Sequence, residues 1–148
     1  DVTTNAEPNQ VKTCTGQRTI DTGIKHGTVS IIYRDMHVEV TSYRVDGTYS
    51  DNRRPDSVVF TSDLREDLKR RDFTVNAMAY NPDVGLVDCF GGLKDMENAV
   101  IKCVGDPSDR FAEDALRIMR AYRFASTLNF KIDDDTLKAI TEKMDLLA

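Results

Sequence analysis

The sequence lacks the features that would place a protein in a membrane or hold it together by covalent cross-links. It has no run of about 18 apolar residues that could span a bilayer, and its first residues are too polar for a secretory signal. Its three cysteines are odd in number and widely spaced, unlike a disulfide framework or a zinc site. We therefore expect a cytoplasmic protein, not bound to membranes, whose cysteines are reduced and structural.

Histidine is also scarce, since His26 and His37 are the only two. Carboxylates are then the natural ligands for any metal, which favours a hard ion such as Mg²⁺. The net charge of −5 counts against a nucleic-acid coat over the whole surface. The composition, 40% hydrophobic and 30% charged over 148 residues, is typical of one folded domain or of one domain and the start of a second.

A cationic cluster, Arg70-Arg71-Asp72, runs directly into an apolar segment. Apolar residues recur at helical spacing in 73–80, and with a helix start at Ser62 or Asp63 this predicts helical structure over 62–80. Two arginines and a carboxylate are costly to bury unless an anionic ligand such as a triphosphate consumes the charge. The alternative is an exposed helix start.

The preceding part of the chain reads as a sheet. Segments 27–33 and 37–43 are rich in β-branched and aromatic residues and predict a β-hairpin. In the second strand Glu39 and Thr41 share one face, and Val38 and Val40 the other. Glu39 is thus a site carboxylate or a solvent-facing glutamate. Residues 46–56 have the Gly, Asp, Ser, Asn, Arg and Pro content of a mobile loop.

The later part reads as helices. Asp106-Pro107 is a strong helix start, and a long helix is expected over 109–127, followed by another over 133–147. On a helical wheel the long helix has a polar face and an opposite, mostly apolar arc. The polar face holds Glu113, Arg117, Arg120 and Arg123, and the opposite arc holds Ala115, Ile118, Met119 and Tyr122.

Asp114 lies about 60° from Arg117 on that wheel, so a carboxylate and a guanidinium can point into the same space. Asp accepts from an exocyclic amino group and Arg donates to a ring acceptor, so such a pair could read cytosine and adenine while rejecting uracil and guanine. The alternative is a helix-surface salt bridge.

Three segments resemble a known family: KRRDFTVNAMAY, GLVDCFGGLKDMENAVIKCVGDPSDRFAEDALRIMRAYRFASTLNF and HGTVSIIYRDMHVEVTSYR. They are similar to class II tRNA nucleotidyltransferases, the CCA-adding enzymes, which are related to bacterial poly(A) polymerases. The resemblance implies an α+β fold, with a nucleotidyltransferase head of mixed or antiparallel sheet at 1–90 and a helical, nucleotide-reading neck at 91–148. It also implies addition of C and/or A from CTP and ATP to the 3′ end of tRNA, by Mg²⁺-assisted phosphoryl transfer.

The resemblance assigns roles to individual residues. Asp1 matches the second aspartate of the catalytic motif, a metal ligand, and Glu39 matches the third acidic position. Asp114 and Arg117 match the pair that reads the base of the incoming nucleotide. The other residues matched to nucleotide binding are Arg71, Asp72, Asn76, Arg120 and Arg123.

The resemblance also has gaps. The family's first catalytic aspartate and its helical body and tail have no counterpart, so the chain is expected to be an internal piece of the enzyme and inactive by itself. The loop at 46–56 is similar to the one that A-adding enzymes possess, which favours CCA or A addition. Two alternatives remain at this point: a bacterial poly(A) polymerase, and a non-catalytic nucleotide- or RNA-binding remnant of the fold. The sequence does not predict an oligomeric state.

Overall fold

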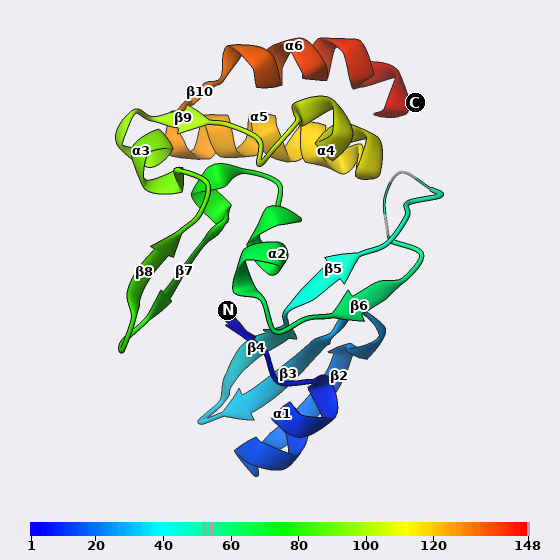
Figure 1. Ribbon diagram of the computed structural model, residues 1–148, viewed down its shortest axis with the longest axis vertical. Coiled ribbons are helices and arrows are strands. Elements are labelled where there is room, and N and C mark those ends of the chain that lie inside the picture. Colours follow the sequence, from blue (N-terminus) through cyan, green and yellow to red (C-terminus); the bar gives the residue numbers. More distant parts are fainter. Residues whose placement is uncertain (52, 54, 148) are drawn as a thin grey trace. The chain divides into compact units, whose positions relative to one another are not determined.

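The computed structural model describes residues 1–51, 53 and 55–147, which form two compact units. Unit 1 comprises Asp1–Gly47 and Ser57–Asp67, and unit 2 comprises Thr48–Asp56 and Leu68–Ala148. The mixture of sheets and helices confirms the predicted α+β class (Figure 1). Two residues of the predicted loop, Asn52 and Arg54, lie outside the described residues. The expected division into a head at 1–90 and a neck at 91–148 stays a prediction.

Unit 1 is built on a four-stranded mixed sheet with the strand order β1-β4-β3-β2. The strands are β1 (Val2–Thr4), β2 (Arg18–Gly23), β3 (Thr28–Tyr33) and β4 (Met36–Ser42). The first strand pairs with β4 in parallel, and the other neighbours are antiparallel. The predicted hairpin is confirmed as β3–β4, and its turn residues Arg34 and Asp35 both have positive φ, as a two-residue hairpin turn requires.

The two faces of this sheet differ as the alternation of β4 predicted. Helix α1 (Pro8–Thr15) covers the apolar face, where Val11 packs with Ile31 and Val40 (Figure 1). The opposite face of β4 carries Glu39, which is exposed, and Thr41, which is half-buried. The sheet therefore buries one side and offers a polar side to solvent.

The remainder of unit 1 differs in part from the prediction. Strands β5 (Arg44–Asp46) and β6 (Val58–Phe60), which the sequence did not indicate, form an antiparallel pair on either side of the predicted loop at 46–56. A 3₁₀ turn, η1 (Ile24–His26), precedes β3, and α2 (Leu64–Lys69) begins in unit 1. The fully buried Asp67 accepts a hydrogen bond from the backbone N–H of Arg44 at 3.2 Å. Burial, with the nearby Asp67 charge, raises the pKa of Tyr43.

Unit 2 packs helices and short strand pairs around one apolar core. Phe73, Phe111, Ile118 and Ile140 are among its fully or almost fully buried members. Its secondary-structure elements in chain order are η2 (Thr74–Asn76), β7 (Met78–Asn81), β8 (Gly85–Asp88), α3 (Gly92–Glu97), β9 (Val100–Ile101), α4 (Pro107–Glu113), α5 (Leu116–Leu128), β10 (Lys131–Ile132), α6 (Asp134–Lys143) and η3 (Met144–Leu147). The predicted helix starts are confirmed, since the Asp106 side chain accepts hydrogen bonds from two backbone N–H groups of α4, and the Asp133 side chain accepts one from a backbone N–H of α6.

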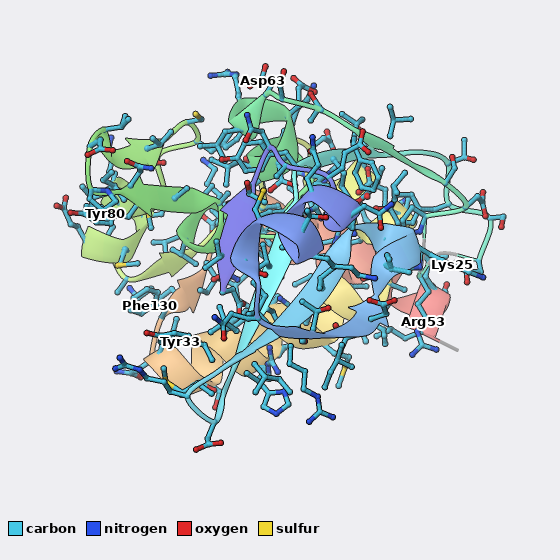
Figure 2. All side chains as sticks on the ribbon, turned by 90° about the horizontal axis from the view of Figure 1, so that it is seen from below. Lys25, Tyr33, Arg53, Asp63, Tyr80 and Phe130 are labelled. Carbon is cyan, nitrogen blue, oxygen red and sulfur yellow. The ribbon has the colours of Figure 1, made fainter. Side chains whose placement is uncertain are left out.

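The predicted helix over 62–80 is wrong beyond its first part. After α2 the chain makes the single turn η2 and then enters β7, which pairs with β8 in a hairpin. Gly85, at φ +86°, allows the tight return. Tyr80, counted as part of a buried helical face, is 73% exposed on this hairpin (Figure 2). Cross-strand pairing overrides a helical period that spans only about two turns.

The long helix expected over 109–127 is also wrong, because the chain breaks between α4 and α5. Asp114 has extended backbone angles, φ −143° and ψ 101°, and ends α4. Within the continuous helix α5, the buried face also differs from the apolar arc of the wheel, because Met119 and Tyr122 are 58% and 47% exposed whereas Arg117 of the polar face is buried. Among the described residues no helix is both long and apolar enough to cross a membrane. The cysteines are free thiols, as expected.

Candidate functional site

Asp72 is the most heavily hydrogen-bonded carboxylate among the predicted site residues. It is 7% exposed, and its Oδ1 accepts from the backbone N–H of Phe73 at 2.9 Å and from Asn76 Nδ2 at 3.2 Å. Its Oδ2 accepts from Nε of Arg120 at 2.7 Å and lies 2.7 Å from Nη2 of the same guanidinium, with which it forms an ion pair. Charge-assisted bonds of this kind offset the cost of burying a carboxylate. Asp72 therefore links the start of η2 to the middle of α5.

The segment that follows Asp72 is held in place on two sides. Phe73 pairs with Cys103 in an isolated antiparallel β-bridge, and the Thr74 N–H donates to the Lys102 carbonyl at 2.9 Å. On the other side, a Cβ at Gly92 would collide with the Thr74 carbonyl oxygen, so only glycine permits this approach of α3 to η2. The turn that carries Asp72 and Asn76 is thus fixed by backbone contacts.

The Asp88-Cys89-Phe90-Gly91-Gly92 connector builds the start of α3. Asp88 Oδ1 accepts from the N–H of Gly92 at 2.9 Å and Oδ2 from that of Leu93 at 2.9 Å. Burial acts to raise the pKa of Asp88, but hydrogen bonds from the backbone of Leu93, Gly92, Phe90 and Gly91 outweigh it, and the net pKa is lowered. The connector is therefore a structural support for η2, and Asp88 is its central acceptor.

Arg117 is held by three acceptors on two segments of unit 2. Its side chain is 10% exposed, and Nη1 donates to Glu113 Oε2 at 2.6 Å and to the Arg110 carbonyl at 3.2 Å. Its Nη2 donates to the Arg70 carbonyl at 3.1 Å. The second oxygen of Glu113 accepts from Arg110. Burial opposes the charge, yet the hydrogen bond and the negative charge of Glu113 raise the pKa of Arg117 above its ordinary value, with Tyr49 and Asp114 contributing. The guanidinium is charged at every physiological pH.

Asp114 lies three residues earlier, at the break between α4 and α5. Its Oδ1 accepts from the Leu116 N–H at 3.0 Å and so satisfies a donor at the start of α5. Within the described part of the chain, Oδ2 accepts no hydrogen bond. At the break, the predicted pair thus has a partly free carboxylate on Asp114 and a guanidinium on Arg117 that keeps few unused donors.

Arg120 and Arg123 share an aromatic neighbour, Phe124. The guanidinium carbon of Arg120 lies 5.2 Å from the centroid of the Phe124 ring, and that of Arg123 lies 4.8 Å from it. The ring in turn meets the buried Phe73 edge-on, with centroids 5.9 Å apart. Arg123 is exposed, and it forms no ion pair with any residue that the structure describes. The two arginines therefore leave positive charge at the surface of α5.

Unit 1 holds the two predicted catalytic carboxylates on neighbouring strands. Val2 pairs with Val40 in the parallel β1–β4 ladder, so the residues before them, Asp1 and Glu39, lie level with one another. Both are exposed. The described residues contain no cluster of three or more potential metal-ligating side chains. Two carboxylates fit the donor preference of a hard divalent cation, which commonly takes one or two protein carboxylates and completes its shell with substrate phosphates and water.

The structure thus joins most of the predicted nucleotide-binding residues within unit 2. Asp72, Asn76 and Arg120 share one hydrogen-bonded group, and Asp114 and Arg117 flank the α4–α5 break. Arg71 is half-buried directly before Asp72. The sequence reasoning left Phe124 out of the site, and gave Glu113 and Arg110 no role there. The four-residue spacing of Arg120 and Phe124 on one helix was a signal that could have found the first of these.

Comparison with known proteins gives a consistent result. A sequence profile of the poly A polymerase head domain matches residues 1–102. The chain is 50% identical to the CCA-adding enzyme of Enterococcus faecalis and 52% identical to that of Pediococcus pentosaceus, in each case over 147 residues and 99% of this chain. It spans only 36% and 37% of the lengths of these relatives.

Solved structures show the same likeness. The CCA-adding enzyme of Bacillus stearothermophilus in complex with CTP matches with a TM-score of 0.89 and 43% identity, over 98% of this chain and 34% of that one. The Thermotoga maritima CCA-adding enzyme complexed with tRNA matches with a TM-score of 0.69 and 26% identity, over 93% of this chain and 30% of that one. The residues of α4 and α5 lie beyond the family profile but inside these longer matches.

Proposed function

This chain belongs to the poly A polymerase head-domain family, and from that premise we propose that it is part of a tRNA nucleotidyltransferase that adds C and A to the 3′ end of tRNA. The observation that carries the proposal is the position of Asp114 and Arg117 at the start of α5, each held by its own hydrogen bonds, in a chain about half identical to proteins named CCA-adding enzymes. CTP, ATP and the tRNA 3′ end are the proposed partners, and the cytoplasm is the proposed location.

The base would be read by Asp114 and Arg117. The unengaged Oδ2 of Asp114 can accept a hydrogen bond from the exocyclic amino group of cytosine or adenine. The remaining Arg117 donors can reach a ring acceptor on the same edge, while Glu113 and two carbonyls keep the guanidinium in place. Uracil and guanine present a carbonyl where Asp114 needs a donor, so they are rejected.

The remaining roles follow from charge and burial. Arg71, Arg120 and Arg123 would bind phosphate oxygens, with Arg120 oriented by Asp72 and Asn76 supporting that carboxylate. Asp1 and Glu39 would hold a divalent cation, which we propose to be Mg²⁺. Such an ion supplies positive charge for the attacking hydroxyl and the leaving pyrophosphate. No covalent nucleophile is required of the protein.

Titration of the chain with each of the four nucleoside triphosphates tests this function. We expect CTP and ATP to bind at least tenfold more tightly than UTP and GTP, since one good bidentate base contact is worth about 1–3 kcal/mol. Asp114→Ala should abolish the preference. Asp109→Ala is the matched control, because it removes the same charge from an exposed position on α4. Equal binding of all four nucleotides to the unaltered protein would refute the proposal.

Incorporation provides the second test. With Mg²⁺ and a tRNA that lacks its 3′ end, the protein that contains this chain should incorporate label from both CTP and ATP. Incorporation of ATP alone would instead indicate a poly(A) polymerase, and binding without incorporation a non-catalytic module.

A further inference from the structure

Phe124 lies at the centre of the cationic surface of α5, and its surroundings are unusual for a core phenylalanine. It is only partly buried against the unit 2 core, where its ring meets Phe73 edge-on. Its exposed side carries two guanidinium groups, those of Arg120 and Arg123. One residue thus joins the apolar core to the positive charges.

The two arginines reach the ring in different ways. Arg120 is four residues before Phe124, a spacing at which helical side chains are neighbours, so this contact is expected of any such pair. Arg123 immediately precedes Phe124, and adjacent residues on a helix do not face each other. Its guanidinium nevertheless lies 4.8 Å from the ring centroid, the shorter of the two distances. The Arg123 side chain must therefore fold back along the helix to reach the ring.

This arrangement gathers two positive charges with only one of them neutralised. Asp72 accepts the Nε proton of Arg120 and forms an ion pair with its Nη2, so other N–H donors of that guanidinium remain for further acceptors. Arg123 has no carboxylate partner among the residues that the structure describes. Like charges on one ring repel each other, and an anion placed between them would remove that repulsion.

We propose that Phe124 is a positioning residue, whose ring fixes the guanidinium groups of Arg120 and Arg123 as a paired binding site for polyphosphate. The triphosphate of the incoming nucleotide is its ligand, so the inference rests on the function proposed above. Asp72 holds Arg120 but not Arg123, whereas the Phe124 ring restrains Arg123 as well. A restrained donor loses less conformational entropy when it binds a ligand. Leucine at 124 would fill similar space without holding either guanidinium.

The test compares two phenylalanines that pack on the same core. Phe124→Leu removes the aromatic face, and Phe124→Tyr keeps it. Phe130→Leu is the matched control, because Phe130 is also partly buried against this core and makes no cation–π contact among the described residues. Urea unfolding of each variant measures its stability, so that binding is compared between folded proteins.

The first measurement needs no nucleotide. In NMR spectra of the arginine side chains, the protons of Arg123 should be shifted upfield by the ring current of Phe124. This shift should persist in Phe124→Tyr and Phe130→Leu and disappear in Phe124→Leu. The second measurement is the affinity for inorganic tripolyphosphate. Phe124→Leu should weaken it about threefold to tenfold, the range expected for one or two exposed cation–π contacts, and the other two variants less than twofold.

The outcomes separate this inference from the proposed function. Equal tripolyphosphate affinities for Phe124→Leu and Phe130→Leu, or an Arg123 spectrum unchanged by Phe124→Leu, would overturn the positioning role whatever the protein does with CTP. If tripolyphosphate binding depends on Phe124 while CTP and UTP bind alike, the positioning role stands and the nucleotide-reading function fails.

Discussion

Removal of the Glu113 carboxylate should destabilise the protein far more than its place on the short helix α4 indicates. The carboxylate accepts from both Arg110 and Arg117, and the Arg117 side chain is only 10% exposed. Glu113→Ala therefore leaves a buried guanidinium without its counter-charge, a change that typically costs about 3–5 kcal/mol. Two carbonyl acceptors, those of Arg70 and Arg110, still solvate Arg117, and Glu113 itself is 24% exposed. We therefore expect a loss of about 2–3 kcal/mol.

Urea unfolding at neutral pH measures this loss, and a second ion pair with the same N–O distance serves as the control. Lys12 and Asp21 form an ion pair at 2.6 Å, the distance between Arg117 and Glu113, but their side chains are 28% and 50% exposed. Asp21→Ala should cost less than about 1 kcal/mol. The double variant Glu113→Ala, Arg117→Met should recover part of the Glu113→Ala loss, because it removes the stranded charge. A Glu113→Ala cost no larger than that of Asp21→Ala would refute the reasoning.

Three further predictions concern other parts of the chain. Gly92→Ala should destabilise the folded protein by at least about 2 kcal/mol, because the added Cβ would collide with the Thr74 carbonyl oxygen in η2. At Gly91 a Cβ has open space but the backbone φ is +77°, so Gly91→Ala should cost about 1–2 kcal/mol; thermal unfolding measures both. Burial raises the pKa of Cys103 to about 12, so a thiol-specific reagent should label the exposed Cys14 in the folded protein and Cys103 only after unfolding. The pKa of Asp88 is lower in the folded protein than its ordinary value, so the ionised carboxylate stabilises the folded state at any pH above that ordinary value. This stabilisation is lost as the pH falls through the lowered pKa. In acid titration, the difference in stability between the unaltered protein and Asp88→Asn should therefore shrink below about pH 4.

Elements with a local signal were predictable from the sequence. The Asp106-Pro107 start of α4 needs only a capping carboxylate and a proline, and both are adjacent in the chain. The β3–β4 hairpin shows alternation on both strands, and the burial of Val40 opposite the exposed Glu39 follows from that alternation. The family resemblance rested on motifs of this contiguous kind, and the sequence profile and the relatives confirm it.

The errors occurred where distant segments decide the outcome. Met78–Asn81 is a strand because it pairs with β8, which no helical period within the segment could indicate. Arg117 is buried, and one of its hydrogen bonds is accepted by a carbonyl 47 positions earlier in the chain, a contact that a helical wheel cannot indicate. Asp114 ends α4, and its side chain accepts a hydrogen bond from the Leu116 N–H; such local side-chain bonds of aspartate compete with helix formation. The roles of Asp72, Arg120 and Arg123 in nucleotide binding stay predictions.

The break at Asp114 also changes how force passes along this part of the molecule. A continuous helix would transmit a twist through its ladder of backbone hydrogen bonds, but here the Leu116 N–H is taken by a side chain. Across the break, the Arg117 side chain donates to Glu113 and to the Arg110 carbonyl, and the Arg117 backbone N–H donates to the Asp114 carbonyl at 3.0 Å. Side-chain links can be cut one at a time while each helix keeps its own hydrogen bonds. The α4–α5 junction is therefore a joint whose stiffness can be altered by single substitutions at these side chains.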